Sequence, residues 1–263
     1  MAGDKIRLRF AKTGTLRLLS HHDLMRCLER MLRRADLPFK CTAGFHPNPR
    51  IVFALSLPLG VVGLDEVLEI EFTRELDAED VRARLDAAAP EGLRFTRAGA
   101  IPMRSTAIPR RVVYRFPLPV DRAASVAERC RELLHEPKVW VDRLHPSLKS
   151  INIRPYFRNL TVSEGEDRAV LLDLWVTQTG TARADEVLEL LGVEDLTDAG
   201  SQIERTTLEL RDETANAGPP DSPPDGPAET RPLDPVTVSL LTRRSPERSA
   251  AALCASLSGP IVE

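Results

Sequence analysis

An order of strand-like and helix-like patterns that occurs twice along the 263 residues is the feature that most constrains the fold. In residues 5–10, apolar side chains alternate with lysine and arginine at the two-residue period of a strand, giving one apolar and one basic face. Ser20 and Asp23 then form a capping pattern, followed by apolar residues at helical spacing up to about Ala35. The chain is therefore expected to begin with a strand and a capped helix.

The positions up to about residue 100 complete a first unit. The expected elements are strands at 39–43 and 51–57, a helix at 78–88 and a strand at 93–98. Residues 67–72 are expected to form either a separate strand or a continuation of the strand at 51–57. The order βαββαβ predicts a ferredoxin-like unit over residues 1–100, with an antiparallel sheet and two helices on one face.

A second set of elements repeats this order after a proline-containing connection. The expected elements are a strand at 112–117, a helix at 121–135, edge pieces at 139–141 and 151–153, a strand at 170–177, a helix at 184–191 and a strand at 203–210. They predict a second ferredoxin-like unit over residues 110–212. The expected fold class is therefore α+β, with two tandem ferredoxin-like units and antiparallel sheets.

The composition changes after this second unit. Residues 213–235 hold seven prolines among Gly, Asp, Ser and Thr, which is typical of a disordered linker. Residues 236–263 contain a helix-like part at 249–257 and are too short for a core of their own. We expect this short tail either to dock on a partner or to stay mobile.

Composition and cysteine spacing bound the class of protein. With 42% hydrophobic and 29% charged residues, the chain is not a disordered or fibrous protein. The apolar run 51–64 is too short to span a membrane, and no apolar stretch of signal-peptide length follows the charged N-terminus, so we expect a cytoplasmic protein. The four cysteines show no metal-binding spacing and are expected to be buried free thiols.

Charge is distributed unevenly beneath the formal net charge of −3. Residues 1–50 contain eleven basic and four acidic side chains, and residues 104–158 contain twelve basic and five acidic ones. Such regions favour either a surface that binds phosphate groups or ordinary solvated helix faces. On the first helix, Arg26, Arg30 and Arg33 lie on the face opposite the apolar stripe.

Two segments of the first unit could bind an anion. His21, His22 and Asp23 begin the first helix, where free backbone N–H groups favour a phosphate and a histidine could act as general acid or base. The alternative is a simple helix cap. Residues 44–50 form a proline-stiffened loop whose polar side chains suit a polar ligand, unless the loop is only structural. These side chains are His46, Asn48 and Arg50.

In the second unit, Arg154 and Arg158 alternate with Tyr156 and Phe157, a composition that suits single-stranded nucleic acid. The alternative places both aromatic rings in the core. Because aromatic residues are only 5% of the chain, helices and loops are better candidates for RNA contact than the sheet faces. Arg183 and Arg205 are expected at the edges of elements, where they could join this patch.

Several chemistries lack their sequence signatures. The chain has no phosphate-binding P-loop, no dinucleotide-binding glycine pattern and no nucleophile elbow. His21, His46 and Asp23 lack the spacing that would commit them to a metal. We therefore expect neither a metal nor another cofactor.

Four motifs carry a resemblance to a known family, most densely within residues 5–72. They read RLRF at 7–10, LSHHDLMR at 19–26, AGFHPNPR at 43–50 and FALSLPLGV at 53–61. These segments resemble the radical-SAM-linked protein family, a domain of unknown function, over about residues 1–210. His22 replaces a usually apolar residue, and the Pro-rich tail is a further difference.

The resemblance implies a domain that occurs alone or at the C-terminus of longer radical-SAM proteins. It also implies RNA metabolism by association, because genes of this family often lie near those of ribonuclease E/G-type enzymes and ribosomal proteins. The chain lacks the radical-SAM cysteine triad, so such chemistry would lie on another chain.

Together these observations favour a non-catalytic, accessory RNA-binding protein. We expect the side chains that bind phosphate to lie together in one groove. They are His21, His22, Arg26, His46, Asn48, Arg50, Arg154 and Arg158. Two alternatives remain open: a metal-independent ribonuclease that uses His21 or His46, and a docking partner of a radical-SAM enzyme that contacts no RNA.

Overall fold

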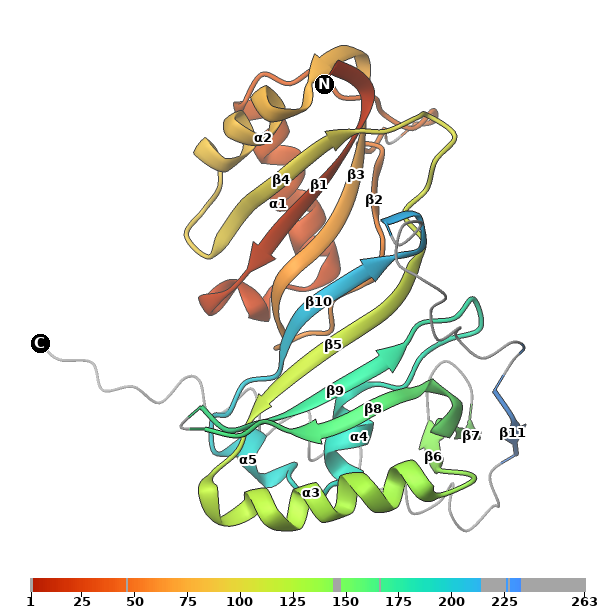
Figure 1. Cartoon of the computed structure of the whole chain (residues 1–263). Helices are drawn as coiled ribbons and strands as arrows, with labels where there is room; N and C mark the ends of the chain where they lie inside the picture. Colours follow the sequence, from red (N-terminus) through yellow and green to blue (C-terminus); the bar gives the residue numbers. More distant parts are fainter. Residues whose placement is uncertain are drawn as a thin grey trace, which may run out of the picture.

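The computed structural model describes residues 2–45, 47–143, 148–165, 167–213, 226 and 228–232 (Figure 1). Most of the predicted linker and the whole predicted tail at 236–263, with its helix-like part, lie outside the described residues. Within the linker range, however, β11 (Thr230–Arg231) pairs with another strand.

The first half of the chain follows the expected order of strands and helices. Its elements are β1 (Ala2–Lys12), the 3₁₀ helix η1 (Gly14–Leu18), α1 (His21–Arg34), β2 (Ile51–Phe53), β3 (Val62–Asp77), α2 (Ala78–Ala87) and β4 (Leu93–Ala100). The strands lie in the order β4-β1-β3-β2, and every neighbour is antiparallel. Ser20 caps α1 as predicted, because its hydroxyl accepts the backbone N–H of Asp23.

The second half contains more elements than the sequence predicts. Its elements are β5 (Pro109–Pro117), α3 (Val120–His135), β6 (Trp140–Arg143), β7 (Lys149–Asn152), η2 (Arg154–Tyr156), β8 (Phe157–Val162), β9 (Ala169–Trp175), α4 (Ala184–Leu190), α5 (Asp195–Asp198), β10 (Glu204–Leu210) and η3 (Arg211–Glu213). The main strands lie in the order β10-β5-β9-β8, again with antiparallel neighbours.

The two halves share one sheet of eight strands, so the protein is α+β as predicted, but its main sheet is continuous. The join is a short parallel pairing in which Glu204 and Arg205 of β10 lie opposite Val62 and Gly63 of β3. The expectation of purely antiparallel sheets is therefore wrong at this join. Figure 1 shows β10 and β5 of the second half in the middle of this sheet, between β3 and β9.

Three predicted strands differ from the structure. The segment 39–43 forms only isolated bridges, at Phe39 and at Cys41. Because prolines lack the N–H that a ladder requires, the proline-rich stretch around it does not continue as a strand. The edge pieces at 139–141 and 151–153 correspond to β6 and β7, which form a separate sheet with β11 instead of lying in the main sheet.

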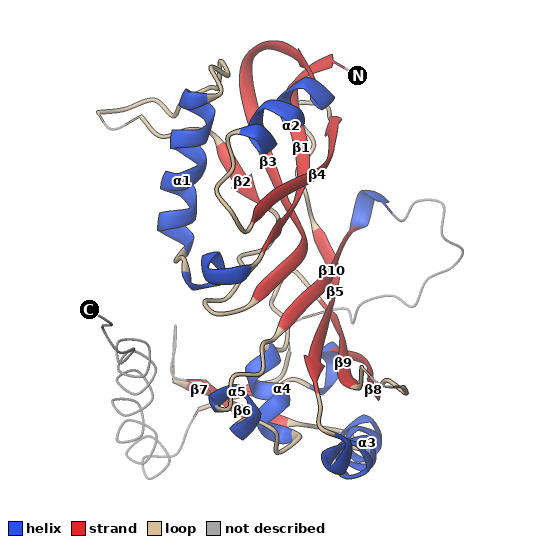
Figure 2. Ribbon diagram, turned by 90° about the vertical axis from the view of Figure 1, so that its left-hand side faces the viewer, coloured by secondary structure: helices blue, strands red, loops and turns tan. Residues whose placement is uncertain are grey.

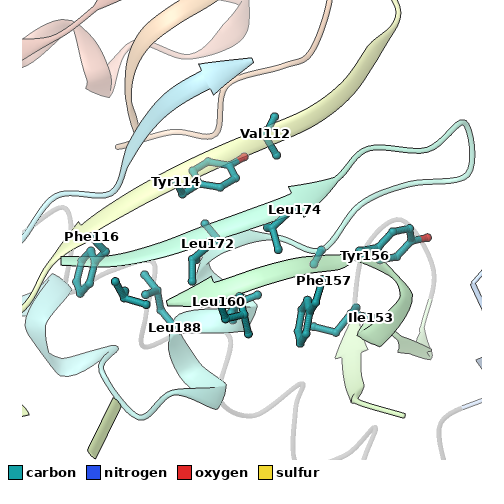
Figure 3. Close-up of a cluster of buried hydrophobic side chains, with 14 of the residues drawn as sticks. Val112, Tyr114, Phe116, Ile153, Tyr156, Phe157, Leu160, Leu172, Leu174 and Leu188 are labelled. Carbon is teal, nitrogen blue, oxygen red and sulfur yellow. The ribbon is translucent and has the colours of Figure 1, made fainter. Parts of the chain in front are cut away.

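Each half has its own core on the helix side of the sheet. In the first half, Ile6, Leu8 and Phe10 of β1 are buried against both α1 and α2. In the second half, Val112 and Phe116 of β5 belong to the cluster shown in Figure 3. The alternation of β1 consequently turns its basic residues to the opposite face, which carries none of the α-helices that the structure describes and is called the helix-free face below.

Candidate functional site

The exposed face of α1 carries a stripe of arginines. Leu24, Leu28, Met31 and Leu32 are buried against the sheet. Arg26, Arg30, Arg33 and Arg34 are exposed on the other side, as their helical spacing predicts. We call these four residues the α1 arginine stripe.

Only part of this stripe is neutralised. Arg33 pairs with Glu29 at 2.8 Å, and Arg26 lies 3.6 Å from Asp23. Arg30 and Arg34 have no carboxylate partner within the described part of the chain. The α1 arginine stripe therefore presents uncompensated positive charge to solvent.

The loop at residues 41–50, hereafter the 41–50 loop, leaves from the C-terminal end of α1. It is held at its base, where Thr42 N–H donates to the carbonyl of Asn48 and Asn48 N–H donates to the Thr42 hydroxyl. Phe45 near its tip is fully exposed. Just before the loop, the Arg33 guanidinium lies over the ring of Phe39 at 5.5 Å. Figure 2 shows the loop near the C-terminal end of α1.

The predicted histidines lie at the other end of α1. His21 and His22 are exposed, and the His21 ring packs edge-on against Phe53 at 5.0 Å. The side chain of Asp23 accepts the Ser20 hydroxyl at 2.6 Å, so Ser20 and Asp23 are engaged in the cap. A helix of 14 residues is about 21 Å long, so these histidines and the 41–50 loop are well separated (Figure 2).

The eight predicted site residues are consequently not gathered in one groove. Arg50 lies at the base of the 41–50 loop and pairs with Glu71 at 3.1 Å. His46 lies outside the described residues. The 41–50 loop follows the C-terminal end of α1, His21, His22 and Arg26 belong to the N-terminal half of that helix, and Arg154 and Arg158 lie in the second half of the chain.

Arg154 and Arg158 in the second half serve the packing of that half. Arg154 donates to the carbonyls of Leu134 and Glu136 at the end of α3, at 2.6 and 3.1 Å. Arg158 donates to Asp173 at 2.6 Å and stacks on Trp175. Tyr156 and Phe157 are buried, so the core alternative is the one observed.

Arg205 is not an edge residue, contrary to expectation. It is 1% exposed and donates to both oxygens of Glu66, and it also donates to the carbonyls of Leu55 and Ser56. Burial alone would lower the pKa of Arg205, but the adjacent Glu66 carboxylate more than reverses this and raises it. The nearby Lys12 is also buried, and burial lowers its pKa.

A second charged site, which the sequence did not indicate as a site, lies on the helix-free face of β1. Arg7 donates to Glu69, and Arg9 donates to Asp65 at 2.6 Å. Both arginines line a pocket of about 260 Å³. The alternating lysine and arginine of residues 5–9 were the available signal, but their partners lie far away in the chain.

Two other kinds of site have no candidate among the described residues. Among the described residues, no three His, Cys, Asp or Glu side chains lie close enough to hold a metal ion. None of the helices in the described ranges combines the length and apolar composition needed to cross a bilayer.

Comparisons with known proteins identify the family. No curated protein matches the chain. Among solved structures, the crystal structure of an unknown protein from Galdieria sulphuraria matches 80% of this chain and 99% of its own, at 9% identity and a TM-score of 0.23, which is too low to indicate a shared fold. A family model described as "Uncharacterized protein conserved in bacteria (DUF2344)" matches residues 5–184, and the chain therefore belongs to this bacterial family.

Proposed function

We propose that this chain is an accessory RNA-binding protein that contacts the phosphate backbone through the α1 arginine stripe and the 41–50 loop. The observation that carries the proposal is the exposure of Arg30 and Arg34 without a carboxylate partner among the described residues. Unneutralised arginines on one helix face attract a polyanion and can bind its phosphates in a bidentate way.

Phe45 adds a second kind of contact to the same region. Its ring is fully exposed, although moving a phenylalanine side chain from water into a protein interior is favourable by about 1.5–3 kcal/mol. An exposed aromatic ring is a surface on which an unpaired base stacks. We infer that the preferred target has single-stranded or looped regions.

The test is a titration of a labelled stem-loop RNA across a salt series. In Arg30→Ala/Arg34→Ala, the slope of log K against log[salt] should become shallower by about 1 for each arginine, and binding should weaken at low salt. Arg94→Ala/Arg104→Ala removes the same charge from exposed positions outside the stripe and should leave the slope close to wild type.

Two results would contradict the proposal. One is no binding by the wild type at low salt. The other is an equal loss of slope in both double variants, because this would indicate a response to net charge alone.

The radical-SAM linkage is part of this proposal and concerns the partner. The resemblance of residues 19–26 and 43–61 to radical-SAM-linked proteins supports a partner enzyme that acts on the bound RNA. If a radical-SAM enzyme co-purifies with the chain and nuclease treatment abolishes this co-purification, the result would support an association through the bound RNA. Co-purification that resists nuclease and salt would instead favour direct docking without RNA.

Catalysis by His21 is a weaker candidate. The ring is exposed, but it contacts Phe53, and the ring of His22 lies 6.1 Å away between centroids. RNA that stays intact during incubation with the wild type and a chelator would rule out a metal-independent ribonuclease. Cleavage that His21→Ala abolishes would support it.

We also infer that each half is a ferredoxin-like unit. The inference is supported by the common order of fourth, first, third and second strand, with antiparallel neighbours. In the second half, β6 and β7 then form an insertion between the first helix and the second strand. An experimental structure in which either half departs from this order would contradict the assignment.

A further inference from the structure

The helix-free face of the first half carries a row of nearly buried cations. Lys5, Arg7 and Arg9 alternate along β1, and at most 10% of each side chain is exposed. Arg97 of β4, which lies opposite Arg9, extends the row toward the edge of the sheet. Arg97 is exposed, whereas Lys5, Arg7 and Arg9 are buried so deeply that they require nearby negative charge.

The strands themselves supply only half of that charge. Lys5 and Arg7 share Glu69, at 2.9 and 3.0 Å. Arg9 and Arg97 share Asp65, at 2.6 and 3.4 Å. Four cations thus face two carboxylates, which leaves two positive charges on the sheet.

The short helix η3, which follows β10, provides the missing carboxylates. Asp212 pairs with Arg7 at 2.8 Å, and Glu213 accepts a hydrogen bond from Arg9. Figure 2 shows η3 on the side of the sheet away from α1. Burial would lower the pKa of Arg7, but its hydrogen bonds to Asp212 and Glu69 outweigh this and raise it.

The two carboxylates of η3 are the replaceable part of this network. Their side chains are 49% and 37% exposed, whereas Glu69 is fully buried within the sheet. η3 itself is a single three-residue turn. Displacing η3 therefore uncovers two guanidinium groups without disturbing the strands.

A pocket is already present beside these groups. It has a volume of about 260 Å³ and is lined by Arg7, Arg9, Arg97 and Glu213, with Gly99 and Ile101 also on its wall. This is just below the usual range for ligand pockets, so it suits a small molecule. Arg7, Arg9 and Arg97 all line this pocket, and guanidinium groups bind the oxygens of a phosphate.

We propose that this pocket binds a small, doubly charged anion of the phosphate-monoester class, and that Asp212 and Glu213 occupy its arginines when the anion is absent. The bound anion replaces the charge of both carboxylates, so the sheet stays neutral in either state. The site lies on the opposite face from the α1 arginine stripe and does not depend on RNA binding.

Isothermal titration with inorganic phosphate at low salt tests the proposal. Asp212→Asn/Glu213→Gln removes the competing charges and should bind phosphate at least tenfold more tightly than the wild type. Glu75→Gln/Glu91→Gln makes the same change of charge at exposed positions elsewhere and should show no such gain. Adding Arg97→Gln to the first double variant should reverse most of the gain, because this side chain is 68% exposed and tolerates substitution.

Either of two outcomes overturns the proposal. If Asp212→Asn/Glu213→Gln binds phosphate no more tightly than the control pair, the η3 carboxylates only stabilise the fold and do not compete with an anion. If the gain persists with Arg97→Gln, the phosphate binds elsewhere. Circular dichroism checks that the variants fold, and Glu213→Gln alone, which keeps Asp212 on Arg7, serves as a milder variant with the same two criteria.

Discussion

Arg205 of β10 donates from Nε to Oε1 of Glu66 of β3 over 2.7 Å, and the two side chains are only 1% and 2% exposed. The pair lies where the two halves of the sheet meet. Through the carbonyls of Leu55 and Ser56, the same guanidinium also holds the segment that leads from β2 to β3. A single ion pair therefore connects both halves and this segment.

Breaking this pair is expected to be severely destabilising. Glu66→Ala leaves the guanidinium of Arg205 buried without its counter-charge, which costs about 3–5 kcal/mol of unfolding free energy. Urea denaturation at neutral pH measures the loss. The double variant Glu66→Leu/Arg205→Met removes both charges and should recover part of it; a double variant that is as unstable as the sum of the single variants would contradict this account.

The same pair shows why part of β3 could not be predicted. The alternation at residues 67–72 indicates a strand, but β3 begins earlier, at Val62, and includes Gly63, Asp65 and Glu66. Polar residues at these positions hide the strand pattern. Glu66 is buried only because Arg205 pairs with it, and that partner is 139 residues away. No local pattern contains this information.

The strand β8 escaped prediction for a local reason. Its register shifts between Phe157 and Asn159, so the buried Phe157 and Leu160 are three positions apart instead of two. A bulge of this kind breaks the alternation by which strands are recognised. The exposed Arg158 within the strand then resembles part of a nucleic-acid-binding loop.

The charged sites likewise include one feature that local spacing predicts and one that depends on residues far apart in the chain. The α1 arginine stripe follows from helical spacing within 14 residues and was predicted. The pairing of β1 with Asp212 and Glu213 was not, because it joins positions about 200 residues apart; for Arg9 and Glu213 the separation is 204. Local periodicity reveals faces, whereas their partners depend on the tertiary fold.

Arg154 is expected to matter for stability and not for RNA binding. Arg154→Ala removes hydrogen bonds to the carbonyls of Leu134, Glu136 and Phe157, with an expected cost of roughly 2 kcal/mol. Arg131→Ala, on the exposed face of α3, should cost less than about 0.5 kcal/mol. Chemical denaturation of both variants provides the comparison, and equal costs would show that the carbonyl contacts contribute little.

Phe45 is expected to matter for RNA binding and not for stability. Phe45→Ser removes a fully exposed ring, so the melting temperature should stay within about 1 °C of wild type. If the ring stacks on a base, RNA binding weakens by about 1–3 kcal/mol. Val120→Ser changes an exposed apolar residue on α3 and serves as the control in the same RNA titration. An unchanged RNA affinity in Phe45→Ser would remove base stacking from the proposed function.

Cys130 makes the stability of the second half sensitive to alkaline pH. Burial raises the pKa of its thiol from 9.0 to about 11, because the thiolate would lie in the apolar core between α3 and the sheet. A raised pKa contributes stability that is present at pH values below the unfolded-state pKa and is lost as pH rises through the folded-state pKa.

The pH window for this effect therefore lies between about 9 and 11. Over this window the wild type should lose roughly 2 kcal/mol more than Cys130→Ala, because the unfolded thiol ionises freely while the buried one does not. At pH 8, before this loss begins, Cys130→Ala should be less stable than the wild type, because the alanine leaves a cavity. Urea denaturation of both proteins at pH 8 and pH 10.5 measures the difference. Parallel losses in the two proteins would mean that other groups, such as the buried Tyr114 whose pKa is also raised by burial, account for the alkaline instability.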